Sequence, residues 1–223
     1  KVDYIEMGPF FEPIKGQRTP LDQMTPEKNQ QLKLLLDKYK LSVKQIYVHT
    51  PGNEQKWRRL FEWAKAWNVD ALVAEPQYEN FAMVNRLAQE YKIHVIIHNH
   101  PQKNNRFWHP DKVLSHIAPL SPYMGINPDL GHWIRMGIDP AKQIARPELY
   151  SKLKAFHFND CEASAIARSP HCITGQGAGN LDQVMKTLKT QGFKGRFTIE
   201  YGKWPHNYED IKQIIQYIDE QAK

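Results

Sequence analysis

The stretch DALVAEPQYENFAMVNRLAQEYKIHVIIH, residues 70–98, contains a complete β-α-β unit. Residues 71–74 and 93–97 are short, almost wholly apolar runs, as expected of strands that are buried on both faces. Residues 79–91 between them carry apolar side chains on one face of a helix. A helix that joins two such strands predicts a right-handed crossover, and therefore a parallel sheet.

The same alternation of short strands and amphipathic helices runs through the whole chain. Strands are predicted at residues 2–7, 43–50, 70–75, 94–98, 123–129, 153–158 and 196–201. Helices are predicted at residues 26–38, 54–67, 79–91, 110–117, 140–149, 181–191 and about 207–221, with Thr25, Asn53 and Asn180 as N-caps of three of them. Repeated β-α units with short links are typical of an α/β protein.

These repeats predict a single (β/α)8 TIM-barrel domain over residues 1–223. Such a barrel has eight β-α units in roughly 250 residues, whereas the pattern gives seven strands in 223 residues. The simplest account is that the first β-α unit lies upstream of residue 1. A doubly wound open sheet is the competing fold, but it normally carries a Gly-rich phosphate-binding turn, and no GxGxxG follows the first three predicted strands.

Composition narrows the class of protein. Hydrophobic residues make up 41% of the chain, which is enough for a core. The mean hydropathy is -0.65, and no apolar run approaches 18 residues, so no membrane span is expected. The net charge is +6, but the Lys and Arg residues form no dense block. We therefore interpret the charge as a solvated surface and expect no nucleic-acid partner.

The two cysteines, Cys161 and Cys172, could pair with each other, but they form no CxxC metal motif and no disulfide framework. The chain opens directly in a predicted strand, and no signal peptide precedes it. The compartment is therefore open: a cytoplasmic location is favoured, and a periplasmic location is the alternative.

Polar, chemically capable residues stand at the end of each predicted strand. They are Glu6, His49, Glu75, His98 with His100, Asp129 with His132, His157 with Asp160, and Glu200. In a closed barrel the carboxyl ends of the strands form one rim, where the active sites of this architecture lie. An acidic side chain at the end of an apolar strand loses water, so it must be paired, hydrogen-bonded or bound to a metal.

The mixture of Asp, Glu and His favours a transition-metal or zinc site over an all-oxygen calcium site. One such residue alone is more often a satisfied rim or core group. Together, the strand-end residues predict a bound divalent ion, with Mn, Zn, Co, Fe and Mg all open.

Five stretches resemble the sugar phosphate isomerase/epimerase family, the xylose-isomerase-like barrels that also include apurinic-site endonucleases. They are VAEP (73–76), IIHNHP (96–101), DLGHW (129–133), AFHFND (155–160) and GQGAGNLDQVMKTLKTQGFKGRFTIEYG (175–202). The resemblance covers nearly the whole chain and implies a TIM barrel with a divalent metal. It is fairly specific for the superfamily and says little about the substrate.

The resemblance implies that Asp129, His157 and Glu200 bind the metal. The fourth ligand is either Glu75 or His98, because His98 stands where the family usually has a glutamate. In the family, two glutamates on opposite faces of the substrate move a proton. Here Glu200 stands at a familiar base position, and its catalytic partner would be Glu75 or a histidine such as His98.

A second group is expected to bind substrate or to line the pocket. It consists of His132, His100, Glu6, His49, Asp160, Trp108 and Arg106. For Asp160 the alternative is that it fixes the His157 ring. The Gly175–Gly179 run is expected to form a turn at the pocket edge, not a nucleotide site.

These assignments predict a metal-dependent isomerase or epimerase that removes a proton next to a carbonyl of a sugar or sugar phosphate. A lyase or hydratase acting on 3-keto-sugars or glycosides is the main alternative. An abasic-site nuclease and a non-catalytic barrel that binds a sugar or a protein are weaker alternatives. The expected partner is a small carbohydrate, and a homo-oligomer is also expected because such barrels commonly dimerise through helix faces.

Overall fold

The computed structural model of the protein describes residues 2–48, 50–101, 106–202 and 208–223. The chain divides into two compact units. The first comprises residues 1–96 with 120–124, and the second comprises residues 97–119 with 125–223. The expectation of one domain over the whole chain stays a prediction.

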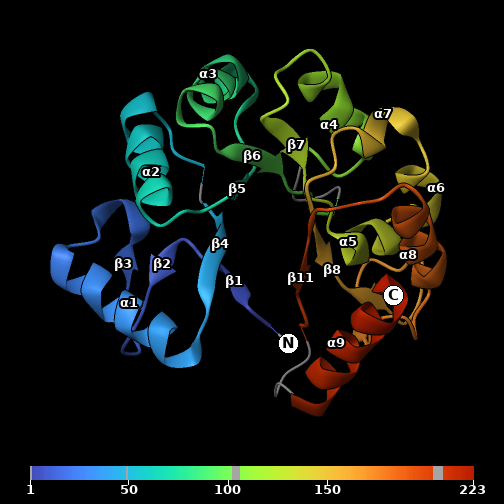
Figure 1. Cartoon of the computed structure of the whole chain (residues 1–223). Helices are drawn as coiled ribbons and strands as arrows, with labels where there is room; N and C mark the ends of the chain where they lie inside the picture. The colour runs from blue at the N-terminus through green and yellow to red at the C-terminus, as the bar shows by residue number, and fades with distance from the viewer. Residues whose placement is uncertain (1, 49, 102–105, 203–207) are drawn as a thin grey trace. The chain divides into compact units, whose positions relative to one another are not determined.

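The first unit begins with the repeating pattern that the sequence predicted (Figure 1). Its elements are β1 (Tyr4–Met7), β2 (Phe10–Phe11), β3 (Thr19–Pro20), the 3-10 helix η1 (Leu21–Gln23), α1 (Pro26–Tyr39), β4 (Ser42–Tyr47), α2 (Glu54–Ala66), β5 (Ala71–Ala74), η2 (Tyr78–Asn80), α3 (Phe81–Tyr91) and β6 (His94–Ile97). The sheet order is β1-β4-β5-β6-β7, in which β7 spans Met124–Ile126, and β1/β4 and β4/β5 pair in parallel. The boundary between the units passes through β6 and β7.

Local capping explains where the first two long helices begin. The Thr25 side chain accepts a hydrogen bond from the Lys28 N–H at the start of α1, and Asn53 accepts one from Lys56 at the start of α2. Both caps were predicted, and each satisfies an N–H that has no partner within its helix. Helix α2 then buries its apolar face, with Trp57 fully inaccessible to solvent.

The second unit contains more short elements than the sequence pattern suggested. They are α4 (Pro110–Ile117), β7 (Met124–Ile126), α5 (Leu130–Arg135), α6 (Pro140–Ile144), α7 (Pro147–Tyr150), β8 (Ala155–Phe158), β9 (Asp160–Cys161), β10 (His171–Cys172), α8 (Leu181–Thr190), β11 (Arg196–Ile199) and α9 (Tyr208–Ala222). Strands β8 and β11 lie side by side and pair in parallel, with His157 opposite Thr198 (Figure 1). Their carboxyl ends therefore point the same way, and Glu200 follows directly after β11.

Aromatic packing holds the β8/β11 pair in place. The rings of Phe156 and Phe197 stack at 5.6 Å, and Phe158 and Phe193 meet Phe197 edge-on at 5.0 and 5.8 Å. Burying one such side chain contributes about 1.5–3 kcal/mol. The strand ends that carry His157 and Glu200 are thus supported by a rigid apolar layer.

Each of the seven predicted strands is present, as β1, β4–β8 and β11. Two local predictions were wrong. The helix predicted at residues 140–149 is two helices, because Arg146 precedes Pro147 and takes an extended conformation that ends the first one. Asn180 does not cap α8 through its side chain but adopts a left-handed backbone conformation with φ 49°.

Two further features bear on the class of protein. Cys161 and Cys172 are both free thiols. Among the described residues, no helix combines the length and the apolar character that crossing a membrane requires.

Candidate metal centre

Four potential metal ligands lie together in the second unit. His98, Asp129, His157 and Glu200 each place one ligand atom within 4.8 Å of those of the other three. They come from the ends of β6, β7, β8 and β11, as the strand-end pattern predicted. Asp129 and His157 also form an isolated parallel β-bridge, which extends the β7 segment alongside β8.

The cluster has a buried part and an accessible part. His98 Nε2 lies 3.8 Å from Asp129 Oδ2, and both side chains are almost fully buried. His157 Nδ1 lies 2.8 Å from Glu200 Oε2. The Glu200 side chain is 52% exposed, whereas that of His157 is 6% exposed. Glu200 is therefore the member of the cluster that a molecule in solution can reach most easily.

Asp129 is held on both its backbone and its side chain. Asn99 Oδ1 accepts a hydrogen bond from the Asp129 N–H at 2.8 Å, and Asn99 Nδ2 donates to the Asp129 carbonyl at 3.2 Å. Asp129 caps helix α5, since its Oδ1 accepts from the His132 N–H at 2.7 Å. Asn159 Nδ2 donates to Oδ2 at 3.1 Å. The carboxylate is thereby fixed before any ligand arrives.

Gly131 allows this arrangement. Its N–H donates to Asn159 Oδ1, so Asn159 links the start of α5 to the Asp129 carboxylate. A Cβ added to Gly131 would lie 2.6 Å from that same oxygen. A side chain at residue 131 would therefore displace Asn159 and loosen its hold on Asp129.

The charge of Asp129 is compensated by imidazoles. Burial alone would raise its pKa, but the neighbouring imidazoles of His98, His132 and His157 hold the pKa well below its usual range. The carboxyl group is therefore ionised across the physiological pH range, as a metal ligand must be.

Further imidazoles surround this carboxylate. The ring of His98 lies 4.6 Å from those of His100 and His157, and the ring of His100 lies 5.2 Å from that of His132. Burial lowers the pKa of His132 to about 4, against the opposing charge of Asp129. His132 Nδ1 is buried and has no hydrogen-bond partner within the described part of the chain. His132 is thus neutral near pH 7, the form that binds a metal or a substrate hydroxyl.

This donor set fits a divalent cation. Two carboxylates and two imidazoles converge, and Asp, Glu and His are the residues that bind zinc and the neighbouring transition metals. A buried carboxylate beside several imidazoles gains more from a metal than from water, which hardly reaches it.

Several predicted site residues lie in the first unit. Glu75 accepts a hydrogen bond from the Tyr47 hydroxyl at 2.9 Å, and its carbonyl accepts one from Thr50 Oγ1. Glu6 lies in β1, opposite Gln45. His49 lies outside the described residues. The proposed roles of these three residues stay predictions.

Arg106 and Trp108, two further residues predicted to bind substrate, lie in the second unit. The guanidinium of Arg106 lies 5.3 Å from the centre of the Phe107 ring, and the Trp108 ring lies 5.1 Å from that of His109. These contacts fix both side chains beside their sequence neighbours, and their roles in substrate binding stay predictions.

Asp160 has a role that the sequence did not reveal. It is fully buried, and its carboxylate faces the Gly-rich loop. It accepts hydrogen bonds at 2.9 to 3.1 Å from the backbone N–H groups of Cys161, Gly175, Gly177 and Gly179. An added Cβ on Gly177 would lie 2.5 Å from Oδ1, so this close approach requires glycine. The repeated glycines after a buried acid were the available signal.

His171 was not singled out by the sequence, because it stands in the two-residue strand β10. Its Nδ1 accepts a 3.4 Å hydrogen bond from the Gly202 N–H, two residues after Glu200. Burial and the charge of Arg135 lower its pKa, opposed by Asp129 and Glu200. His171 therefore lies close enough to Asp129 and Glu200 for both charges to act on its pKa.

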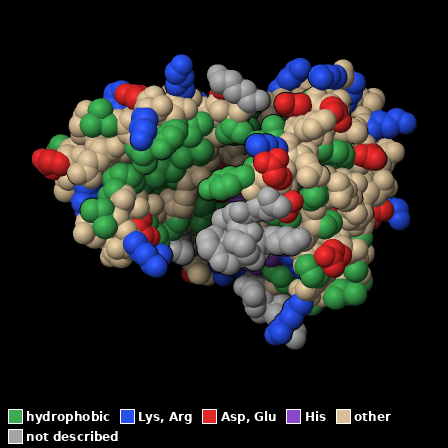
Figure 2. Space-filling view, turned by 90° about the horizontal axis from the view of Figure 1, so that it is seen from below, with side chains coloured by type: hydrophobic (Ala, Val, Ile, Leu, Met, Phe, Trp, Pro, Cys, Tyr) green, Lys and Arg blue, Asp and Glu red, His purple; other side chains and the backbone are tan. Residues whose placement is uncertain are grey.

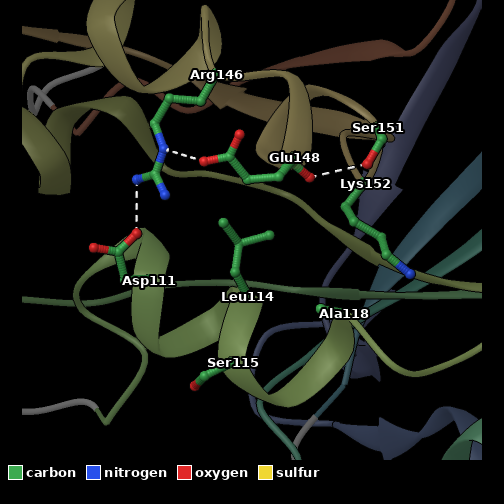
Figure 3. A pocket seen from close by; sticks show the side chains of 8 residues that line it. All are labelled: Asp111, Leu114, Ser115, Ala118, Arg146, Glu148, Ser151 and Lys152. Carbon is green, nitrogen blue, oxygen red and sulfur yellow. Dashed lines mark hydrogen bonds and ion pairs between the residues drawn. The ribbon is translucent and has the colours of Figure 1, made fainter.

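A separate cavity of about 440 Å³ lies between α4 and residues 146–152, which include α7 (Figure 3). Its lining residues are Asp111, Leu114, Ser115, Ala118, Arg146, Glu148, Ser151 and Lys152. Arg146 is held between Asp111 at 2.7 Å and Glu148 at 2.9 Å. None of the four clustered ligands lines this cavity.

The positive net charge is dispersed over the face drawn in Figure 2, where Lys and Arg side chains alternate with Asp and Glu. Among the described residues, Arg58 contacts Glu54 at 2.9 Å and Glu90 at 2.7 Å. On the described residues of this face no continuous basic area is seen. The expectation of no nucleic-acid partner stays a prediction.

Comparison with known proteins identifies the family. The family model described as xylose isomerase-like TIM barrel matches residues 2–221. The chain belongs to this family. Its TIM-barrel fold, predicted from the β-α repeats, is thereby confirmed. No curated protein matches the chain.

Solved structures agree on the fold. An uncharacterised protein from Parabacteroides distasonis ATCC 8503 is 24% identical, with 97% of this chain and 87% of that chain covered and a TM-score of 0.73. D-psicose 3-epimerase from Clostridium cellulolyticum H10, solved with D-tagatose, is 10% identical (99% and 89% covered, TM-score 0.74). A xylose isomerase-like barrel from Mycobacterium smegmatis, in complex with magnesium, is 14% identical, with 92% of this chain and 82% of that chain covered and a TM-score of 0.72. At such identities the likeness shows the fold alone.

Proposed function

We propose that the protein is a metal-dependent isomerase or epimerase that acts on a sugar or sugar phosphate by removing a proton next to a carbonyl. The observation that carries this proposal is the convergence of His98, Asp129, His157 and Glu200. Structural neighbours that are D-psicose 3-epimerase and L-ribulose 3-epimerase support a ketose-like substrate.

The four clustered residues would hold the metal. A divalent cation bound there supplies Lewis acidity, which polarises a carbonyl and an adjacent hydroxyl of the substrate and acidifies the C–H bond between them. Asn99, Asn159 and the start of α5 fix Asp129, so the charge at the centre is positioned before substrate binds.

Glu200 is the proposed general base. A base must lie within hydrogen-bond reach of the proton that it takes, and the exposed Glu200 carboxylate meets this requirement better than the buried Asp129. His157 Nδ1, at 2.8 Å from Oε2, orients the carboxylate. Return of the proton by Glu200 to the neighbouring carbon gives isomerisation. Return of a proton to the opposite face of the substrate, by a second acid, gives epimerisation.

Neutral imidazoles would orient the substrate oxygens. His132, with its lowered pKa, stays uncharged near pH 7 and offers one N–H donor and one acceptor nitrogen. His100 lies between His98 and His132 and is half-buried. A sugar that presents adjacent hydroxyl and carbonyl oxygens suits such a row of donors and acceptors.

The test measures by NMR how fast substrate C–H hydrogen is replaced by deuterium in D2O. A panel of ketoses and ketose phosphates is tried, with Mn²⁺ or Co²⁺ present. Glu200→Gln should slow the exchange by about 10²-fold or more, because the amide cannot accept the proton. Glu148→Gln, at an exposed glutamate that contacts Arg146, is the matched control and should exchange at the wild-type rate. Full exchange by Glu200→Gln would refute the assignment.

A lyase or hydratase acting on 3-keto-sugars is the second candidate. It is favoured by the composition of the second unit's cluster, where one exposed carboxylate stands among His98, His100, His132 and His157. One base and a neighbouring acid suffice for β-elimination. With a 3-keto-glycoside, elimination would release the aglycone and form an enone, whereas epimerisation would keep the glycosidic bond.

A further inference from the structure

We propose that the metal centre selects ions that accept imidazole ligands over hard, oxygen-preferring ions such as Mg²⁺, and that His98 sets this preference. The inference rests on the metal site of the proposed function and adds the class of ion and the residue that determines it.

The potential ligands divide equally between nitrogen and oxygen donors. The cluster combines two imidazoles, from His98 and His157, with two carboxylates, from Asp129 and Glu200. Imidazole suits Zn²⁺, Fe²⁺, Co²⁺ and Ni²⁺, whereas Mg²⁺ prefers oxygen ligands in an octahedron. The rings of His100 and His132, at 4.6 and 6.1 Å from that of His98, increase the nitrogen content around the centre.

Three of the four potential ligands are buried, and the set carries two negative charges. His98 is 3% exposed, Asp129 1% and His157 5%. Mg²⁺ sheds water reluctantly and usually keeps several waters in its proteins, so a site with three buried donors disfavours it. Two carboxylates balance the charge of a divalent ion, and a buried centre without net charge avoids a large desolvation cost. A third carboxylate would break this balance.

His98 occupies the middle of the cluster. Its ring lies 4.6 Å from that of His157 and 4.6 Å from that of His100, and its Nε2 lies 3.8 Å from Asp129 Oδ2. His157 is instead engaged with Glu200 at 2.8 Å. Exchanging the donor at residue 98 therefore changes the ligand type at the centre while leaving the His157–Glu200 pair in place.

The experiment compares wild type, His98→Glu, His98→Gln and the control His116→Gln, which removes a half-buried imidazole on α4 outside the cluster. Each protein is made metal-free by dialysis against a chelator and checked for folding by circular dichroism. Calorimetric titration then gives the affinities for Zn²⁺, Co²⁺, Mn²⁺ and Mg²⁺. X-ray absorption of the zinc-loaded proteins counts the imidazole ligands.

Zinc binds more tightly than magnesium at almost any such site, so the measure is the change in the Zn²⁺/Mg²⁺ and Co²⁺/Mg²⁺ affinity ratios. His98→Glu should lower both affinity ratios by at least about tenfold, because residues that support a metal site change its affinity on this scale. The bound zinc should also lose one imidazole ligand. His116→Gln should leave the ratios and the imidazole count unchanged. Should His98→Glu fail to fold, His98→Gln, which adds no charge, should still lose the imidazole and weaken Zn²⁺ and Co²⁺ binding.

Unchanged ratios with an unchanged imidazole count in the His98 variants would overturn the inference. A wild-type protein that binds none of the four ions would overturn it together with the metal requirement of the proposed function. Predicted ratios without any C–H exchange would support the inference and refute the proposed reaction. C–H exchange together with affinity ratios that do not change in the His98 variants would support the proposed reaction and refute the inference.

Discussion

Asp129 and Asp160 are two buried aspartates at strand ends of the same unit, and they are held in different ways. Asp129 is 1% exposed and receives one hydrogen bond on each oxygen, from the His132 N–H and from Asn159. Asp160 is fully buried and receives two on each oxygen, all from backbone N–H groups. The imidazoles around Asp129 can bind a metal, whereas backbone amides cannot.

A carboxylate has about four lone-pair positions. Within the described residues, donors occupy all four positions of Asp160 and only two of Asp129. We therefore expect remaining acceptor capacity, rather than burial or acidity, to distinguish the proposed metal ligand Asp129 from the structural anchor Asp160. If this distinction is right, variants at the two residues should separate stability from metal binding.

The largest effect is expected for Asp160→Asn. The amide nitrogen would face N–H donors, so about two hydrogen bonds to a charged group are lost, and the free energy of unfolding should fall by at least about 3 kcal/mol. Urea denaturation measures this loss. Metal affinity of the folded fraction, titrated at low temperature, should stay near the wild-type value. A stable variant without metal binding would reverse the roles of the two aspartates.

Asp129→Asn should have the converse effect. Loss of the central negative charge should weaken metal binding by about 100-fold, or about 2.7 kcal/mol. Stability of the metal-free protein should change by only about 1 kcal/mol, because the amide oxygen can still cap α5. Calorimetric titration and urea denaturation of the same preparation give both numbers. Metal affinity equal to the wild type would remove Asp129 from the centre.

Gly131→Ala should disturb Asp129 indirectly. The added methyl group would lie 2.6 Å from Asn159 Oδ1 and displace that side chain, at a cost of about 1–3 kcal/mol of stability and with weaker metal binding. Gly52→Ala is the matched control, since nothing lies within 4 Å of its Cβ position, and its stability should change by less than about 0.5 kcal/mol. Equal losses for both would mean that the approach to Asn159 is not what matters.

The smallest effect concerns the loop that Asp160 holds. Tyr217 packs on Gly175 of this loop and donates a hydrogen bond to Asp182, and burial followed by this bond raises its pKa. The folded state then binds the hydroxyl proton more tightly than the unfolded state, whose pKa is about 10. The contribution of the Tyr217 hydroxyl to the free energy of unfolding should therefore be fully present below about pH 10 and decline above it. Tyr217→Phe should make the decline shallower in urea denaturations repeated at alkaline pH, and equal slopes would exclude this hydroxyl.

Much of the fold could be predicted because its signals are local. Apolar runs give the strands, and Thr25 and Asn53 mark helix starts through their own side chains. The convergence of the four potential ligands could be predicted because parallel strands bring their ends together. Helix α5 was missed because it has only six residues and its N-cap, Asp129, reads as the end of a strand.

The role of Asp160 could not be predicted in the same way. Its main partners are backbone N–H groups 15 to 19 residues later, and almost any residue carries such a group. Only the need for glycine at residues 177 and 179 left a trace in the sequence. His171 was missed for a related reason, because its position depends on a loop that returns to Gly202.

The four consecutive residues from His157 to Asp160 carry a consequence for evolution and engineering. His157 belongs to the cluster of potential metal ligands, and Asn159 donates a hydrogen bond to Asp129. Asp160 accepts hydrogen bonds from the glycine loop. A single-residue insertion or deletion here would misplace all three at once, because successive side chains on a strand alternate in direction. A mutagenesis library aimed at new substrates should therefore leave this stretch untouched and vary the exposed residues 162 and 164–168 that follow it.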